Sequence, residues 1–187
     1  MEELNFSNTR HLITNNYSRW CAFSSTRSGS PLKARADIYP LIDMPDYGEV
    51  MKGSNPITRT EFNQWHEKSV FNIHNERQEI CVGWAAKLIN VYLKTMVYVA
   101  SIGRPGLVEQ IHPPIDGGLW EGIKEKYGTN LNILSKTHSV TRIKDIKTYS
   151  QYKVIMEGIE LIAEDNKCSL LEVEKLWKGT AFKSQLA

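Results

Sequence analysis

The sequence predicts an all-α protein, a compact single-domain bundle of about six to eight helices spanning residues 1–187. Apolar residues recur at three- and four-residue spacings over most of the chain, which is the pattern of helices that bury one face. Capping boxes of the type Ser/Thr-x-x-Glu begin two predicted helices, at 58–61 and at 169–172. Strand signals are weak, because the candidate segments 131–134 and 139–143 are too short to build a sheet.

The N-terminal part is predicted to hold one helix and a long irregular segment. The helix covers about residues 8–23. Its apolar residues are Leu12, Ile13, Tyr17, Trp20 and Cys21. Residues 24–55 are rich in Ser, Gly and Pro, and we expect them to be irregular apart from a short helix near 34–41. Because so long a connection is uncommon in a compact domain unless it has a function, this segment is expected to form part of a binding site.

The middle of the chain predicts two long helices in succession. The first begins at the capping box and runs over 58–75. Its buried residues are expected to be Phe62, Trp65, Val70 and Ile73. The second, over 78–102, is apolar on nearly every side, which is typical of a central buried helix. Gly103 and Pro105 end it, and a short helical turn is expected over 107–111.

Three further helices are predicted in the C-terminal part. One covers 117–127 and is stopped by Gly128, and an amphipathic one covers about 150–164. The last begins at the second capping box and ends at Lys178-Gly179.

The charge distribution leaves a nucleic-acid partner open. The formal net charge is only +2, but residues 10–35 contain five basic residues and no acidic one. A second mostly basic stretch, 136–147, is interrupted only by Asp145. Such segments could follow a phosphate backbone or could be ordinary solvated surface.

Cysteine and histidine spacing predicts neither a metal nor a cofactor. The three cysteines form no Cys-x-x-Cys pair, which suits a reducing compartment. His66 and His74 lie two helical turns apart, too far for ligation from adjacent turns. The longest apolar stretch, 91–102, contains Lys94 and is too short to span a bilayer, and the acidic start at 1–3 does not resemble a signal peptide. We therefore expect a cytoplasmic protein without a membrane partner.

Lys87 and Asp116 are the two main candidates for catalysis. Lys87 lies in the predicted central helix, where loss of solvation favours a neutral, nucleophilic amine, although a long side chain can also extend to the surface. Asp116 follows Pro-Pro-Ile and precedes Gly-Gly, so it could cap the next helix or could stabilise a developing cation or orient water. Asp37 is the next acid to consider if Asp116 is only a cap.

Two motifs resemble the helix-hairpin-helix DNA glycosylases. The run Gly83-Trp84-Ala85-Ala86-Lys87 is similar to the Gly-x-Gly-x-Lys hairpin that opens an apolar helix in that family, with Ala85 at the second glycine. The run Pro114-Ile115-Asp116-Gly117-Gly118-Leu119-Trp120 is similar to the Pro-x-Asp segment that feeds the following helix. The resemblance covers about 40 of the 187 residues.

This resemblance implies an enzyme that excises a damaged or modified base from double-stranded DNA by base flipping. Lys87 would attack the anomeric carbon of the sugar, and Asp116 would assist departure of the base. The pocket for the extruded base is expected to include Trp84, Trp120, Tyr39, Trp65 and His112. Contacts to DNA are expected from the irregular segment, at Arg27, Ser28, Ser30, Lys33 and Arg35. The enzyme could serve repair or defence against phages with modified DNA.

Two other classes of function remain open on the sequence. One is a non-enzymatic helical module that binds DNA or protein in a bacterial defence or toxin–antitoxin system. The other is a small-molecule hydrolase or transferase that uses the same cleft.

Overall fold

The computed structural model describes residues 9–26 and 29–179, and over this part of the chain its regular structure is entirely helical. This confirms the all-α prediction. The elements are α1 (Thr9–Thr26), α2 (Arg35–Asp43), α3 (Gly48–Met51), α4 (Arg59–Glu76), α5 (Val82–Leu93), the π-helical η2 (Lys94–Val99), α6 (Leu107–Gln110), α7 (Gly117–Tyr127), α8 (Leu131–Thr137), the 3-10 turn η3 (Ile143–Asp145), α9 (Tyr149–Asn166) and the 3-10 helix η4 (Leu171–Leu176).

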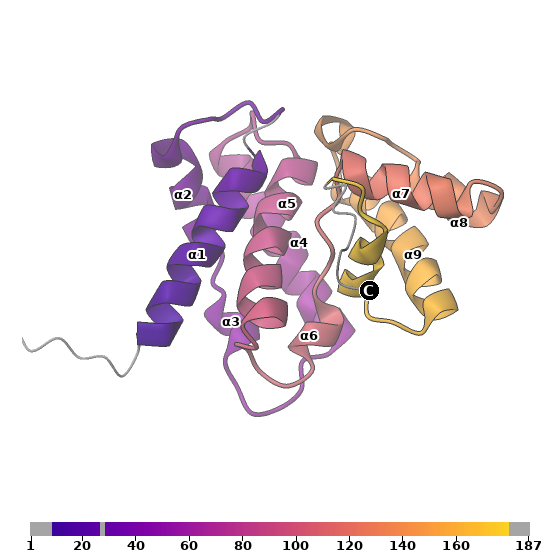
Figure 1. The fold of residues 1–187 in the computed structure, drawn as a ribbon. Coiled ribbons are helices and arrows are strands. Elements are labelled where there is room, and N and C mark those ends of the chain that lie inside the picture. The colour runs from indigo at the N-terminus through magenta and orange to yellow at the C-terminus, as the bar shows by residue number, and fades with distance from the viewer. Residues whose placement is uncertain (1–8, 27–28, 180–187) are drawn as a thin grey trace, which may run out of the picture.

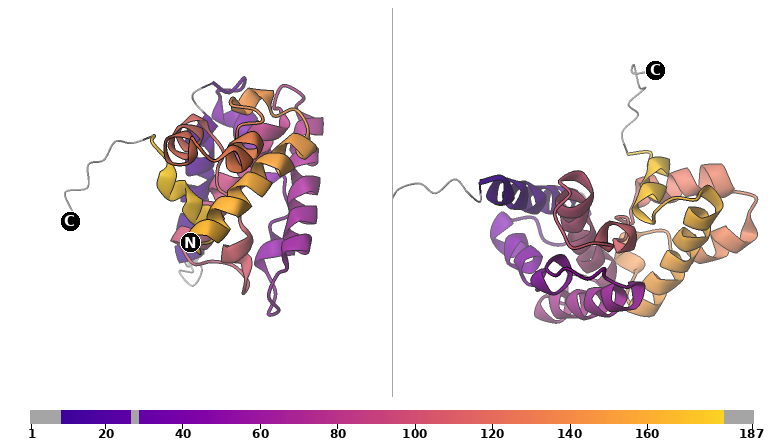
Figure 2. Two further views of the ribbon diagram at one scale, coloured as in Figure 1. Left: turned by 90° about the vertical axis from the view of Figure 1, so that its right-hand side faces the viewer. Right: turned by 90° about the horizontal axis from the view of Figure 1, so that it is seen from below.

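The helices form two groups that lie side by side. Helices α1 to α6 make the N-terminal group, and α7, α8 and α9 make the C-terminal group (Figure 1). The extended segment 111–116 connects them and runs between them. Seen from below, the two groups flank the region where η4 lies (Figure 2). The buried apolar residues of both groups belong to one core.

Three predicted segments differ from the structure. The helix predicted over 78–102 begins only at Val82 and continues as η2 to Val99. The segment 24–55 is less irregular than expected, because it contains α3 as well as α2, which matches the short helix predicted near 34–41. Residues 131–134, considered only as a weak strand, lie in α8. The Asn130 side chain caps this helix by accepting a hydrogen bond from the backbone N–H of Ile133. A seven-residue helix is too short to show a clear apolar period.

Both predicted capping boxes are present, but the helices that they begin differ in kind. Thr58 and Glu61 make the reciprocal bonds that start α4, an 18-residue helix. Ser169 and Glu172 make the same bonds at the start of η4, which is a 3-10 helix of six residues. A capping box therefore located each helix start correctly, whereas helix length depended on what followed.

Helix α1 packs with the face opposite to the one that its apolar residues suggest. Its buried residues are Phe23 and three small ones, Ser18, Ala22 and Thr26. Leu12, Ile13, Tyr17 and Trp20 are exposed, with Ile13 at 64%. Small side chains at the contact allow α1 to pack closely along α5.

Helix α5 is the central element that the sequence predicts. All but one of its twelve residues are buried. Among the described residues, no helix is both long and apolar enough to cross a membrane.

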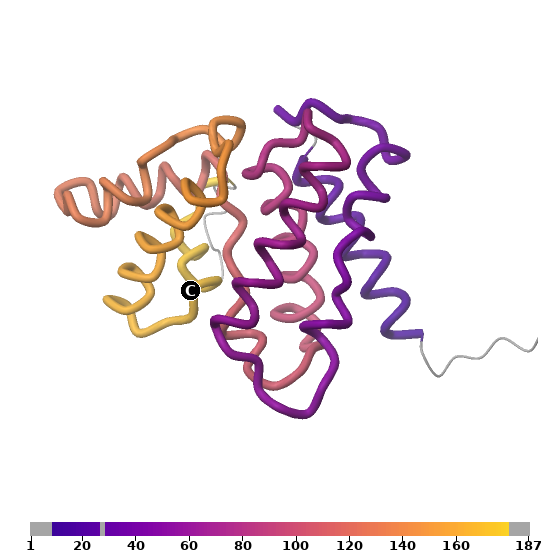
Figure 3. Tube along the Cα trace, turned by 180° about the vertical axis from the view of Figure 1, so that it is seen from behind, coloured from indigo at the N-terminus to yellow at the C-terminus, as the bar shows by residue number. Residues whose placement is uncertain are grey.

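A buried polar network surrounds Asn90 of α5. The Asn90 amide nitrogen donates to the Pro113 carbonyl oxygen (3.1 Å) and to the Tyr152 hydroxyl (2.9 Å). Its side-chain oxygen lies 2.9 Å from Nε2 of His66, whose Nδ1 is 2.7 Å from the Tyr149 hydroxyl. Seen from behind, α4 and α9 lie on either side of the connecting segment (Figure 3). The network thus joins α4, α5, α9 and that segment.

His112 extends this network and completes its hydrogen bonding. Nδ1 of His112 lies 3.0 Å from the Tyr152 hydroxyl, and Nε2 lies 3.2 Å from the Asn63 side-chain oxygen. Each imidazole therefore contacts one hydroxyl and one amide oxygen, which suits a neutral ring with its proton on Nε2. Burial lowers the pKa of His66 to about 4 and that of His112 well below its usual range.

The protein is expected to lose stability as the pH falls from about 6.5 toward 4. Above the ordinary histidine pKa both rings are neutral in the folded and unfolded chain. Below it the unfolded chain binds protons that the folded chain excludes, so the free energy of unfolding decreases until the pH nears the lowered pKa of the folded state. The expected loss is about 2 kcal/mol per histidine between about pH 7.5 and pH 5.

Urea unfolding at a series of pH values measures this loss. His66→Gln should unfold with a shallower pH dependence than the wild-type chain. A wild-type free energy of unfolding that stays constant over this range would contradict a neutral buried pair.

Candidate active site at the contact between Lys87 and Asp116

Lys87 points into the molecule and meets Asp116. Its Nζ lies 3.1 Å from Oδ2 of Asp116, and the two side chains are 10% and 23% exposed. The amine is also 5.5 Å from the ring centroid of Trp84, one turn earlier on α5. The structure therefore brings together the two residues that the sequence singled out from separate motifs. The ion pair joins the N-terminal group to the first turn of α7.

Asp116 caps α7 and pairs with Lys87 at the same time. Its Oδ1 accepts hydrogen bonds from the backbone N–H groups of Gly118 (3.1 Å) and Leu119 (3.2 Å). These are two of the donors that a helix N-terminus leaves without an intrahelical partner. Asn90 fixes the approach of the chain by holding Pro113. Each oxygen of Asp116 thus has its own set of partners.

Trp177 is a third member of the site, and no pattern in the sequence pointed to it. Its indole Nε1 donates to Oδ1 of Asp116 at 2.9 Å. It belongs to residues 171–179, here called the C-terminal strap, which comprise η4 and the three residues after it. Trp177 is 61 residues from Asp116 along the chain. No local spacing could link the two residues, because only the packing of η4 against α7 brings them into contact.

Two glycines of α7, Gly118 and Gly122, leave room for the C-terminal strap. A Cβ on Gly118 would lie 2.6 Å from Nε1 of Trp177, and one on Gly122 would overlap the Leu176 carbonyl oxygen. A Cβ on Gly117 would have no other atom within 4 Å. Gly118 and Gly122 therefore lie at the contact with the strap, and Gly117 does not.

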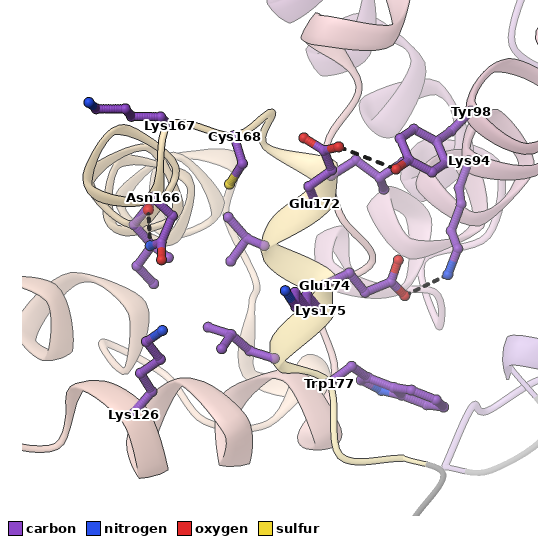
Figure 4. A pocket seen from close by; sticks show the side chains of 14 residues that line it. Lys94, Tyr98, Lys126, Asn166, Lys167, Cys168, Glu172, Glu174, Lys175 and Trp177 are labelled. Carbon is purple, nitrogen blue, oxygen red and sulfur yellow. Dashed lines mark hydrogen bonds and ion pairs between the residues drawn. The ribbon is translucent and has the colours of Figure 1, made fainter. Parts of the chain in front are cut away.

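A hollow of about 850 Å³ lies beside the strap. Figure 4 shows its lining from η4, the end of α9, α7 and η2, with Trp177 at one end. Neither Lys87 nor Asp116 lines the hollow. Trp177 lines it and also donates a hydrogen bond to Asp116. The lysines along it are Lys94, Lys126, Lys167 and Lys175.

Two of the residues predicted for the base pocket, Trp84 and Trp120, are buried in the core. Trp84 is buried next to Lys87, and its indole nitrogen has no hydrogen-bond partner. Trp120 is buried in the C-terminal group, where its indole donates to the Thr137 carbonyl oxygen at 2.7 Å. Only Trp84 therefore lies at the ion pair.

The remaining predicted pocket residues have other neighbours. His112 belongs to the buried network around Asn90. Trp65 donates to the Asp46 carbonyl oxygen at 3.0 Å, and Tyr39 packs edge-on against Phe23. Their placement in the N-terminal core reflects the usual role of aromatic residues in a small helical protein.

Asp37 and three of the predicted DNA contacts, Ser30, Lys33 and Arg35, lie on or near α2. Asp37 forms an ion pair with Arg77, with 2.9 Å between its oxygen and the guanidinium nitrogen. Arg35 is exposed and lies over the ring of Phe23. Ser30 is buried, Lys33 is exposed, and Arg27 and Ser28 fall outside the described residues.

The segment similar to a hairpin lies at the start of α5, directly after the short turn 77–81 that joins it to α4. The backbone N–H of Gly83 donates to the Ile146 carbonyl oxygen at 3.1 Å, and a Cβ on Gly83 would overlap the Ile143 carbonyl oxygen. The close approach that Gly83 permits is therefore made by residues 143–146 of the same chain.

In the described part of the chain, no three His, Cys, Asp or Glu side chains are grouped so that they could hold a metal ion. Comparisons with family models, curated proteins and solved structures find no match to this chain.

Replacing Asp116 should separate its two structural roles. Asp116→Asn keeps an oxygen that can cap α7 and accept from Trp177, and it loses only the charge pairing with Lys87, whereas Asp116→Ala loses all three contacts. The alanine variant should therefore be less stable than the asparagine variant by about 1 kcal/mol.

Urea unfolding of both variants measures this difference. Adding Lys87→Met to Asp116→Asn should recover part of the lost stability, because it removes the unpaired buried amine. Equal stability of the alanine and asparagine variants would contradict the capping role.

Proposed function

We propose that this chain is a DNA glycosylase that excises a damaged or modified base. The observation that carries the proposal is the 3.1 Å contact between the Lys87 amine and the Asp116 carboxylate, both largely shielded from solvent. These are the two residues to which the resemblance to helix-hairpin-helix glycosylases assigns the chemistry. Lys87 lies on α5 and Asp116 caps α7, and the lysine precedes the aspartate along the chain as in that resemblance.

Asp116 supplies the negative charge that this reaction needs. Breaking the bond between a base and C1′ of the sugar builds positive charge on the sugar ring. A fixed carboxylate stabilises that charge without reorganising during the reaction. Oδ2 of Asp116 is the oxygen that would stabilise this charge, because Oδ1 already accepts hydrogen bonds from the α7 backbone and Trp177.

Lys87 supplies a nucleophile. After it transfers a proton to an acceptor, for which Oδ2 of Asp116 is at hydrogen-bonding distance, its nitrogen lone pair can form a bond to C1′. The bond from C1′ to the base breaks, and the base leaves with that electron pair and takes up the proton that Asp116 received, which restores the carboxylate. If water attacks instead of Lys87, the same carboxylate orients the water and the product is a free abasic site.

The substrate is proposed to be a modified base in duplex DNA, extruded from the helix before cleavage. Lys126, Lys167 and Lys175 line the hollow beside the strap and carry the positive charge that contact with a phosphate backbone requires. Trp177 lines the same hollow and connects it with Asp116, which does not line it. The modification that is cleaved would distinguish a role in defence against phages with modified DNA from a role in repair.

A binding function without catalysis is the second candidate. It is favoured by the two hydrogen bonds that Asp116 accepts from backbone N–H groups of α7, since capping this helix is a purely structural task. In this case the pair would hold the two helical groups together, and the chain would bind DNA or protein through its surface.

Base release should depend on both members of the ion pair. The wild-type chain is incubated with plain, uracil-containing, oxidised, alkylated and phage-modified DNA, and abasic sites are detected as strand breaks after mild alkali. We expect cleavage of one modified class, with a loss of about 100-fold or more in Asp116→Asn. Lys87→Gln should also lose borohydride-trappable enzyme–DNA adduct if Lys87 is the nucleophile.

Thermal unfolding of each variant controls for loss of the fold. Glu76→Gln, a change at the end of α4, is a matched loss of one carboxylate and should leave cleavage unchanged. Cleavage on no substrate by folded wild-type protein, or full cleavage by both pair variants, would overturn the enzymatic proposal.

A further inference from the structure

The C-terminal strap contacts both helical groups, and its Trp177 donates a hydrogen bond to Asp116. We propose that Trp177 is a positioning residue for Asp116, and that the strap completes the active site by holding the carboxylate with one oxygen toward Lys87. This inference rests on the proposed glycosylase function. It adds a residue that neither the motifs nor the resemblance supplies.

The strap is anchored on the N-terminal group by two polar contacts. Glu174 pairs with Lys94 of η2 at 2.7 Å, and Glu172 accepts a hydrogen bond from the Tyr98 hydroxyl at 3.3 Å. Figure 4 shows both acidic side chains reaching from η4 toward these partners. Lys94 lies two turns after Lys87 along the continuous α5–η2 helix, so the helix that carries the amine also holds the strap.

The strap is anchored on α7 through its backbone. The Lys178 N–H donates to the Gly118 carbonyl oxygen at 3.1 Å, and the Lys178 amine pairs with Glu125 at 2.8 Å. The Leu176 carbonyl occupies the space that a side chain at position 122 would take. Close backbone contact of this kind needs glycine at 118 and 122, one turn apart on the same face of α7.

The consequence for Asp116 is a carboxylate whose two oxygens are no longer equivalent. Oδ1 accepts three N–H donors, from Gly118, Leu119 and Trp177, and Oδ2 faces Lys87. The two backbone donors belong to α7, the helix that Asp116 caps, and the indole adds a donor from a separate element. This third donor resists rotation of the carboxylate, and reaction rates depend steeply on such orientation.

Trp177→Phe tests the role of the indole N–H while keeping an aromatic ring. We expect the single-turnover rate of base release to fall about tenfold, with the affinity for substrate DNA unchanged. Trp20→Phe, at an exposed position on α1, is the matched control and should cleave as wild type does. In an Asp116→Asn background, Trp177→Phe should cause no further loss, because it acts through that carboxylate.

Gly122→Ala tests the strap without altering Lys87, Asp116 or Trp177. The added Cβ displaces Leu176 and with it the indole, so the rate should fall as it does in Trp177→Phe. Gly117→Ala is the matched control on the same helix, because its Cβ has open space around it. Equal rates in Gly122→Ala and wild type would overturn the role of the strap.

The indole N–H resonance of Trp177 provides a readout that needs no catalysis. A bond to a carboxylate shifts this proton downfield, so Asp116→Asn and Gly122→Ala should each move it upfield. If Asp116→Asn leaves the chemical shift of this proton unchanged, the contact between Trp177 and Asp116 is wrong. If the resonance moves but Trp177→Phe cleaves at the wild-type rate, the positioning role is wrong and the glycosylase stands. Absence of cleavage by the wild-type chain overturns the glycosylase, and the positioning role with it, while leaving the contact measured.

Discussion

The buried side chain of Asn90 is the constraint on which the arrangement of this protein depends. It holds the Pro113 carbonyl and the Tyr152 hydroxyl while accepting from His66, so one amide ties α4, α5, α9 and the connecting segment together. A buried amide without these partners would be costly, which makes the arrangement specific rather than merely compact. Lys87 lies three residues before Asn90, and Asp116 lies three residues after Pro113. The same hydrogen bond therefore sets the position of both members of the ion pair.

Asp116 combines tasks that usually belong to different residues. It caps α7, pairs with Lys87 and accepts the indole of Trp177. A cap alone needs neither the ion pair nor the indole, and an ion pair alone needs no helix N-terminus. The combination gives the carboxylate a single orientation, because its partners come from α5, α7 and the strap. Such restriction is what an electrostatic role in catalysis requires, and it also stabilises the contact between the two helical groups.

Local sequence patterns identified helices better than the faces by which those helices pack. Thr58 and Glu61 located the start of α4 because a capping box is satisfied within four residues. The apolar residues of α1 indicated a helix correctly, yet Tyr17 and Trp20 are exposed and Ser18 and Ala22 are buried. Which face is buried depends on how closely α1 can approach α5, and small side chains decide that approach. Trp65 and Trp120, which were predicted for the base pocket, are both buried, and Trp65 also lines a separate hollow with Arg104.

By itself the sequence determined that the chain is helical, where most of its helices begin and end, and that Lys87 and Asp116 merit attention. These follow from period, caps and breakers, which act over a few residues. Only the tertiary structure decided that the two residues meet, that Trp177 joins them, and that Gly118 and Gly122 receive the chain's own strap. Contacts between residues 29 or 61 positions apart depend on how helices pack and where the chain turns back, and no local pattern encodes that packing.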